Sequence, residues 1–133
     1  MSTLTVGQGL EMKSYPIDRA LLVAYANASG DQNPIHQNEE FAKSVGLPDV
    51  IAHGMLTMAL AGKYISDIAG SAAVKEFSAR FTKPVIVPAN ARVQLNISGK
   101  VAAIENGRAK IEIVAEVDGV KVLGMAKASI AIS

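Results

Sequence analysis

The stretch HGMLTMALAGKYISDIA, residues 53–69, decides the fold of this chain. Apolar side chains occupy nearly every side of a helix drawn through it, and the interruptions are Thr57, Lys63, Ser66 and Asp67. A helix that is apolar all round is typical of a protein core or of a membrane span. A span needs ~20 mostly apolar residues, and this helix carries charges in its second half. We therefore predict that residues 53–69 form a buried central helix.

The residues that follow, 72–133, change to the two-residue period of β-strands. Positions 77, 79 and 81 are apolar and positions 78, 80 and 82 are polar, as expected when alternate side chains face opposite sides of a sheet. The dipeptides Asn106-Gly107 and Asp118-Gly119 lie between long runs of strand-forming residues and favour tight hairpin turns. This half therefore predicts an antiparallel meander, and the whole chain predicts an α+β fold whose sheet wraps around the central helix.

Shorter elements are expected before the central helix. Residues 10–17 alternate apolar and polar side chains and contain a proline, which favours an edge strand. Asp18 is placed to cap a helix that Gly30 ends. Asn38 is placed to cap a second, short helix. Two helices therefore separate the edge strand from the central helix.

Composition limits the classes of function. The 133 residues are the length of one ordinary domain and no repeat divides them, so we expect a single domain over residues 1–133. Hydrophobic residues make up 50% and charged residues 19%, which excludes a disordered chain and leaves apolar surface for a subunit interface. The formal net charge is +1 and the basic residues are dispersed, which argues against nucleic-acid binding.

Cysteine content and the N-terminal segment narrow the classes further. The chain has no cysteine, which excludes disulfides, thiolate nucleophiles and zinc–thiolate sites. Residues 1–16 contain neither the basic region nor the long apolar run of a secretory signal. We expect a cytoplasmic protein that does not enter the membrane.

The loop GDQNPIH, residues 30–36, carries the first candidate catalytic residues. Pro34 stiffens the loop and restricts the backbone of Asn33, so Asp31 and His36 can be held toward one point. An imidazole exchanges protons near neutral pH and a carboxylate can orient a water, which suits an acid–base pair. The alternative interpretation is an Asx-turn at Asp31 and a surface histidine. The spacing matches no common metal-ligand pattern, and we predict neither a metal nor a cofactor.

The second candidate element is His53-Gly54, at the start of the central helix. Free N–H groups and the helix dipole favour negative charge at a helix N-terminus, and glycine lets a substrate approach the backbone closely. A carbonyl oxygen beside the Gly54 N–H would be polarised as in an oxyanion hole. For His53, substrate binding and ordinary helix capping both remain open.

Two segments carry a family resemblance: YANASGDQNPIHQNEEFAKSVGLPDVIAHGMLTMALAG, residues 25–62, and RFTKPVIVPA, residues 80–89. They resemble the MaoC-like (R)-specific hydratases and dehydratases of the hotdog fold. Within that family they look most similar to the catalytic B subunit of mycobacterial-type (3R)-hydroxyacyl-carrier-protein dehydratases. The resemblance implies reversible loss of water between carbons 2 and 3 of an acyl-CoA or acyl-carrier-protein thioester in fatty-acid metabolism. It also implies a homodimer, or a heterodimer with a related hotdog subunit.

The resemblance also implies roles for individual residues. Asp31 and His36 would hold the reacting water, and Asn33 would help to hold that dyad. The oxyanion donor would be the backbone amide of Gly54. We expect His36 to be the base for carbon 2 and Asp31 to assist departure of the 3-hydroxyl, while the opposite division of labour remains open.

One departure from the family pattern lies midway along the central helix. Many of these hydratases carry a serine there, whereas this chain has Ala61 and Gly62, which favours the dehydratase branch. Thr57 could supply a hydroxyl, although a bond to its own helix is the ordinary alternative. Two other functions compete: a hotdog thioesterase, and a non-catalytic subunit that binds the acyl chain or the carrier protein. The intact pair of Asp31 and His36 argues against the second of these.

Overall fold

The computed structural model describes residues 3–132, which form an antiparallel sheet with helices on one of its faces. The strands are β1 (Gly9–Ile17), β2 (Val74–Phe81), β3 (Val93–Glu105), β4 (Arg108–Val117), β5 (Val120–Lys121) and β6 (Leu123–Ala131). Their order across the sheet is β1-β3-β4-β6-β2, and the short β5 pairs with β4 outside this order. The predicted edge strand over residues 10–17 is confirmed, because β1 lies at one edge beside β3.

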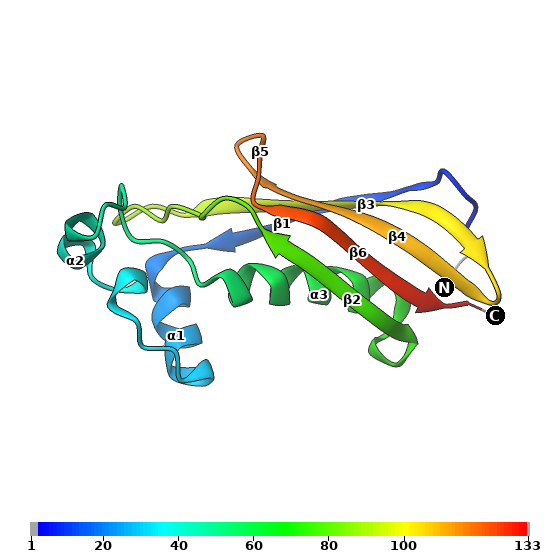
Figure 1. Cartoon of the computed structure of the whole chain (residues 1–133), viewed down its shortest axis with the longest axis horizontal. Helices are drawn as coiled ribbons and strands as arrows, with labels where there is room; N and C mark the ends of the chain where they lie inside the picture. Colours follow the sequence, from blue (N-terminus) through cyan, green and yellow to red (C-terminus); the bar gives the residue numbers. More distant parts are fainter. Residues whose placement is uncertain (1–2, 133) are drawn as a thin grey trace.

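Helix α3 (Gly54–Ala69) is the predicted central helix, and Figure 1 shows it running along one face of the sheet. Its side chains that are buried against the sheet are Leu56, Thr57, Ala61, Tyr64 and Ile65. The Tyr64 hydroxyl donates a hydrogen bond of 2.7 Å to the carbonyl oxygen of Glu11 in β1. This bond ties the middle of the helix to the edge strand.

The opposite side of α3 is open. Met55 is 56% exposed, and Ala59, one turn further on, is exposed as well. The prediction of burial is therefore right for one side of α3 and wrong for the other, because the sheet contacts the helix from a single direction. An apolar helix surface left open in this way is typical of a site where another subunit packs.

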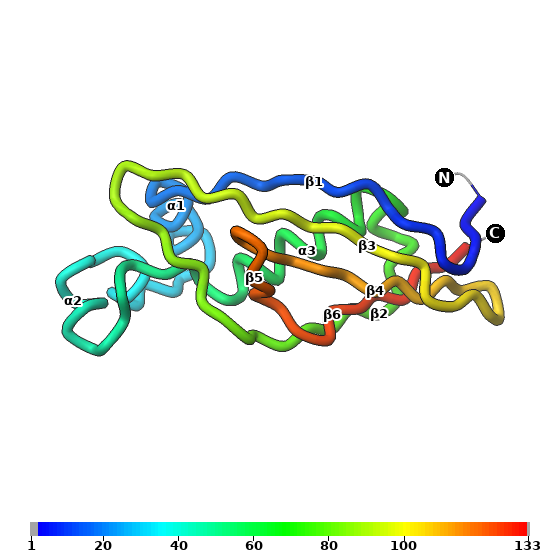
Figure 2. The backbone as a smooth tube through the Cα atoms, turned by 90° about the horizontal axis from the view of Figure 1, so that it is seen from above, coloured from blue at the N-terminus to red at the C-terminus, as the bar shows by residue number. Residues whose placement is uncertain are grey.

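Two helices and a short 3₁₀ helix form the end of the molecule at the start of α3. These are α1 (Arg19–Ser29), η1 (Pro34–His36) and α2 (Glu39–Ser44), and a second 3₁₀ helix, η2 (Ser71–Ala73), follows α3. Figures 1 and 2 both show α1 and α2 beyond the N-terminal end of α3. Among the helices of residues 3–132, none has the length and apolar character needed to cross a bilayer.

The helix caps lie where the sequence predicts them. The Asp18 carboxylate accepts a hydrogen bond of 2.9 Å from the N–H of Leu21 at the start of α1. Gly30 ends α1 in the left-handed conformation, with φ of 82°. The Asn38 side chain accepts a bond of 2.9 Å from the N–H of Phe41 in α2. These caps fix where the loop between α1 and α2 begins and ends.

Arg19 holds the surroundings of that loop together. Its Nε donates to the Val87 carbonyl oxygen at 3.0 Å, and its Nη2 lies 2.9 Å from Glu39 and 2.7 Å from Asp49. The hydrogen bond from the Arg19 guanidinium lowers the pKa of Glu39 below its ordinary 4.5. One side chain thus joins α1 and α2 to the two segments that pass beside them.

Both predicted hairpin turns are confirmed. Asn106 and Gly107 have φ of 54° and 73°, and Asp118 and Gly119 have φ of 50° and 79°, the positive values that a type I′ turn requires. The meander of β3, β4 and β6 follows from them, with one irregularity. Met125 also has a positive φ, of 48°, and from this point toward its start β6 leaves β4 and pairs with β2 alone.

Asp18→Ala is expected to lower the free energy of unfolding by about 1 kcal/mol, because it removes the N-cap of α1. Asp18→Asn is the matched control: it keeps a capping oxygen and removes the charge that lies 3.9 Å from Arg92. Urea denaturation followed by circular dichroism compares the two variants. Equal losses in both would show that the charge, rather than the cap, stabilises α1.

Candidate active site

The loop between α1 and α2 places its two candidate catalytic side chains in different environments. The Asp31 carboxylate is 53% exposed, and its Oδ1 accepts a hydrogen bond of 3.1 Å from the N–H of Asn33. The Asn33 side chain in turn accepts from the N–H of Ile35 at 3.2 Å, which starts η1. His36 ends η1 and is only 7% exposed. The Asx-turn at Asp31 is thus present, and the alternative of a surface histidine is wrong.

His36 and His53 form a reciprocal pair of contacts between the loop and the start of α3. His36 Nδ1 lies 2.8 Å from the carbonyl oxygen of Ile51, and His53 Nε2 lies 3.1 Å from the carbonyl oxygen of Asp31. The two rings stack with centroids 3.8 Å apart and an angle of 22° between their planes. We call these two residues the reciprocal histidine pair. Their two contacts join residues that lie 15 and 22 positions apart in the chain.

The reciprocal bonds determine the tautomer of each ring. A carbonyl oxygen only accepts, so His36 donates from Nδ1 and His53 donates from Nε2. When neutral, His36 therefore carries its free lone pair on Nε2. That atom lies 4.0 Å from Asp31 Oδ2, which is too long for a direct hydrogen bond. A single oxygen atom placed between the two groups would be within hydrogen-bonding distance of both.

His53 is buried in the interior, where its ring is 2% exposed. Burial lowers the pKa of His53 below its ordinary 6.5, against the opposing effect of the bond to the Asp31 carbonyl. Its Nδ1 is buried without a hydrogen-bond partner among the described residues. The rings of Tyr25 and His53 pack in an edge-to-face arrangement with centroids 4.8 Å apart. His53 occupies the N-cap position of α3, as the capping interpretation expects, but its side chain makes no capping hydrogen bond.

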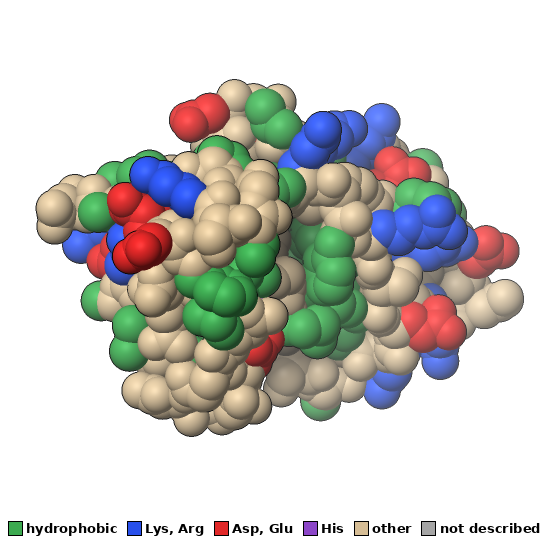
Figure 3. Space-filling model, turned by 60° about the vertical axis from the view of Figure 1, so that its left-hand side comes forward, with side chains coloured by type: hydrophobic (Ala, Val, Ile, Leu, Met, Phe, Trp, Pro, Cys, Tyr) green, Lys and Arg blue, Asp and Glu red, His purple; other side chains and the backbone are tan. Residues whose placement is uncertain are grey.

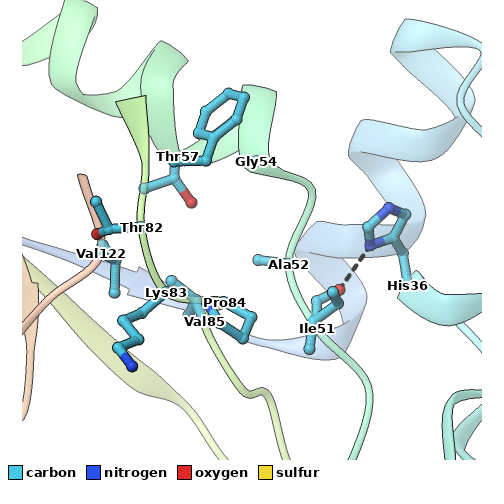
Figure 4. Close-up of a pocket in the computed structure, with 11 residues that line it drawn as sticks. His36, Ile51, Ala52, Gly54, Thr57, Thr82, Lys83, Pro84, Val85 and Val122 are labelled. Carbon is cyan, nitrogen blue, oxygen red and sulfur yellow. Dashed lines mark hydrogen bonds between the residues drawn. The ribbon is translucent and has the colours of Figure 1, made fainter. Parts of the chain in front are cut away.

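A pocket of about 290 Å³ lies beside His36, at the start of α3. Its lining residues are His36, Ile51, Ala52, Gly54, Thr57, Phe81, Thr82, Lys83, Pro84, Val85 and Val122. Figure 4 shows His36 and Gly54 on one side of this space and Thr82 and Lys83 on the other. In Figure 3, hydrophobic side chains flank a hollow in the surface. Asp31, Asn33 and His53 do not line the pocket.

Gly54 has the geometry expected of an oxyanion donor. It is the first residue of α3, so its N–H has no acceptor within the helix, and none is found elsewhere in residues 3–132. A Cβ atom at this position would lie 3.3 Å from the ring of Phe81. Glycine therefore avoids a tight contact with the Phe81 ring at the wall of the pocket.

The carboxylate of Asp31 and the imidazoles of His36 and His53 do not fit a metal centre. Asp31, His36 and His53 each offer one ligand atom, and these atoms lie within 4.8 Å of one another. The lone pair of an imidazole lies in the plane of its ring, so stacked rings direct their lone pairs side by side and not toward one ion at ~2.0–2.1 Å. Each ring also has one nitrogen engaged with a backbone carbonyl.

The sequence does not predict the far wall of the pocket. It is formed by the end of β2 and the segment after it, including Phe81 and Val85, together with Val122 between β5 and β6. Thr82 joins these parts, because its N–H donates to the carbonyl oxygen of Val122 and its hydroxyl to that of Lys121. No local signal marks these residues, although residues 80–89 carry part of the family resemblance.

The profile of a family described as MaoC-like domain matches residues 2–119. The chain belongs to the MaoC-like domain family. The 3-hydroxyacyl-thioester dehydratase X of Mycobacterium tuberculosis is 45% identical over 75 residues, which are 56% of this chain and 26% of that protein. A solved MaoC-like dehydratase has a TM-score of 0.95 and 38% identity over 98% of this chain and 41% of its own.

The MaoC-like fold extends to more distant structures. The ChsH1-ChsH2 complex from Mycobacterium tuberculosis has a TM-score of 0.85 at 20% identity, over 98% of this chain and 100% of the matched chain. The predicted α+β hotdog fold is confirmed by these similarities and by the antiparallel sheet packed on α3. This MaoC-like chain spans about a quarter of the dehydratase X and less than half of the solved dehydratase.

Burial of His53 predicts a stability that falls in acid. The unfolded chain takes up a proton on this histidine near its ordinary pKa of 6.5, whereas folded His53 has a lowered pKa and stays neutral to lower pH. Lowering the pH from about 7.5 to about 5.5 should therefore favour the unfolded state. His53→Gln, which keeps an N–H donor, should show a smaller loss of stability over this range in urea denaturation. An unchanged loss would contradict burial of a neutral His53.

Proposed function

We propose that this MaoC-like chain catalyses the reversible dehydration of (3R)-hydroxyacyl thioesters to trans-2-enoyl thioesters. The observation that carries the proposal is a pocket lined both by His36, whose Nε2 is free, and by the glycine that begins α3, with the Asp31 carboxylate 4.0 Å from that nitrogen. Membership of the family and similarity to a 3-hydroxyacyl-thioester dehydratase over part of the chain support it.

The reaction begins with the carbon-2 proton. A thioester carbonyl acidifies the neighbouring C–H, and neutral His36 accepts that proton on Nε2. The Ile51 carbonyl oxygen, bonded to Nδ1 at 2.8 Å, stabilises the positive charge that the ring then carries. Negative charge develops at the same time on the thioester carbonyl oxygen. The Gly54 N–H and the positive end of the α3 dipole stabilise that charge.

The second half of the reaction removes the 3-hydroxyl. Asp31 accepts a hydrogen bond from this hydroxyl and orients its oxygen toward His36, which the separation of 4.0 Å allows. His36 returns its proton to the leaving oxygen, the bond from carbon 3 breaks, and water departs as the double bond forms. Asn33 supports Asp31 through its backbone N–H. Hydration runs through the same steps in reverse.

A second hotdog subunit is part of the proposal. The side chains at the mouth of the pocket and on the open side of α3 are apolar and more than half exposed: Phe81 at 57% and Met55 at 56%. A second copy of this chain, or a related subunit as in the ChsH1-ChsH2 complex, would cover them and lengthen the pocket for an acyl chain. The thioester carrier is coenzyme A or an acyl carrier protein, and the place of action is the cytoplasm.

Asp31→Asn and His36→Ala are each expected to lower the rate of crotonyl-CoA hydration by about 10²–10⁴-fold, because each removes one group of the acid–base pair. The decrease in enoyl absorbance measures the rate, with the chain alone and with the product of a neighbouring gene. Glu40→Gln is the matched control: an exposed carboxylate of α2 outside the pocket.

Circular dichroism of all three variants shows whether the fold is intact. Near-normal rates in folded Asp31→Asn or His36→Ala would overturn the assignment. Release of free thiol from crotonyl-CoA would indicate a thioesterase instead, because hydration leaves the thioester bond intact.

A further inference from the structure

Thr57 has a hydroxyl that no described residue binds. The residue lies on α3 three positions after Gly54 and is only 4% exposed. A buried threonine in a helix ordinarily bonds to the carbonyl oxygen one turn back, which here is that of His53. That oxygen already accepts the N–H of Leu56 at 3.0 Å and of Thr57 at 3.3 Å. The hydroxyl makes no hydrogen bond with any residue from 3 to 132, so the expectation of a bond to its own helix is wrong.

The hydroxyl points into the pocket. Thr57 is among the residues that line it, and Figure 4 shows its oxygen turned toward the open space between Ala52, Thr82 and Pro84. Side chains of a helix lean toward its N-terminus. The hydroxyl of Thr57 therefore lies over the turn that begins at Gly54, and it faces the same volume as the free N–H of that glycine.

No other side chain of α3 gives the pocket a polar group. The helix contributes two of the lining residues, Gly54 and Thr57, and glycine has no side chain. Gly62, further along the helix, is outside the lining, and a Cβ atom there would meet the ring of Phe77 at 3.5 Å. Gly62 therefore gives the pocket no polar group, and Thr57 supplies the one hydroxyl that α3 contributes to the described lining.

No described residue binds the Thr57 hydroxyl, so it is free to donate its hydrogen to a ligand atom in the pocket. The surroundings determine which ligand atom this is. The Gly54 N–H beside it is also a donor, and two donors that face one volume fit a single oxygen that carries or develops negative charge.

We propose that Thr57 is a catalytic residue whose hydroxyl donates the second hydrogen bond to the thioester carbonyl oxygen, alongside the N–H of Gly54. This inference rests on the proposed function, in which charge develops on that oxygen as His36 removes the carbon-2 proton. The two donors, one from the backbone and one from a side chain, then form the oxyanion hole. Thr57 strengthens its bond as the charge grows, so its effect falls on kcat more than on KM.

Thr57→Val removes the hydroxyl and keeps the shape of the side chain, whereas Thr57→Ser keeps the hydroxyl and is the matched control. The valine variant is expected to hydrate crotonyl-CoA with kcat about 10²-fold lower than wild type, the usual effect of removing one oxyanion donor. The serine variant should retain most of the activity. The thermal unfolding midpoint of Thr57→Val should equal or exceed that of wild type, which separates the effect from loss of the fold.

A second measurement tests the hydrogen bond without turnover. Butyryl-CoA, labelled with heavy carbon at the carbonyl, lacks the 3-hydroxyl and cannot be dehydrated. Its carbonyl stretching band should move to lower frequency on binding to wild type and to Thr57→Ser, and should move less on binding to Thr57→Val.

The two measurements separate the possible failures. Wild type that hydrates crotonyl-CoA, with a valine variant of equal rate and equal band position, overturns the role of Thr57 alone. Wild type that shifts the band in a Thr57-dependent manner but hydrates no enoyl thioester overturns the proposed function and leaves the contact standing. A wild-type band that does not shift overturns the inference about Thr57.

Discussion

The site depends on the reciprocal histidine pair. His36 bonds from the loop to the carbonyl of Ile51, and His53 bonds from the start of α3 back to the carbonyl of Asp31. Each bond fixes the position of a segment and the tautomer of a ring at the same time. The free Nε2 of His36, the place of Asp31 beside it and the position of the helix N-terminus all follow from these two contacts. Neutral, buried His53 makes no contact with the pocket and serves by holding the residues that do.

The rest of the fold fixes the loop and the start of α3 in place and leaves the rim of the pocket exposed. The sheet holds α3 in place, in part through the bond from Tyr64 to β1. Arg19 joins α1 and α2 at the end of the molecule where α3 begins. The pocket is completed by the end of β2 and by Val122. Its apolar rim, which includes Phe81, remains exposed in the single chain. Such a structure suits a catalytic half-site that a second subunit extends, because the chemistry needs rigid groups and the acyl chain needs an apolar cover.

Local signals in the sequence account for most of the fold. Asp18, Gly30 and the two hairpin dipeptides act through their own backbone geometry, so their roles could be predicted residue by residue. The open side of α3 could not, because periodicity does not reveal how many layers cover a helix. Contacts between distant segments could not be predicted either. Examples are the stacking of His36 on His53 and the place of Phe81 in the wall of the pocket. For Thr57 the local rule failed because two N–H groups already occupy the His53 carbonyl.

The central claim is that loop and helix N-terminus act on one thioester from two sides. A crystal structure of the Asp31→Asn variant with a bound (3R)-hydroxyacyl-CoA tests it most directly. The account predicts the thioester carbonyl oxygen about 2.7–3.1 Å from the nitrogen of Gly54, with carbon 2 facing Nε2 of His36 and the 3-hydroxyl beside residue 31. A thioester bound elsewhere, or one whose carbonyl faces away from the start of α3, would contradict it.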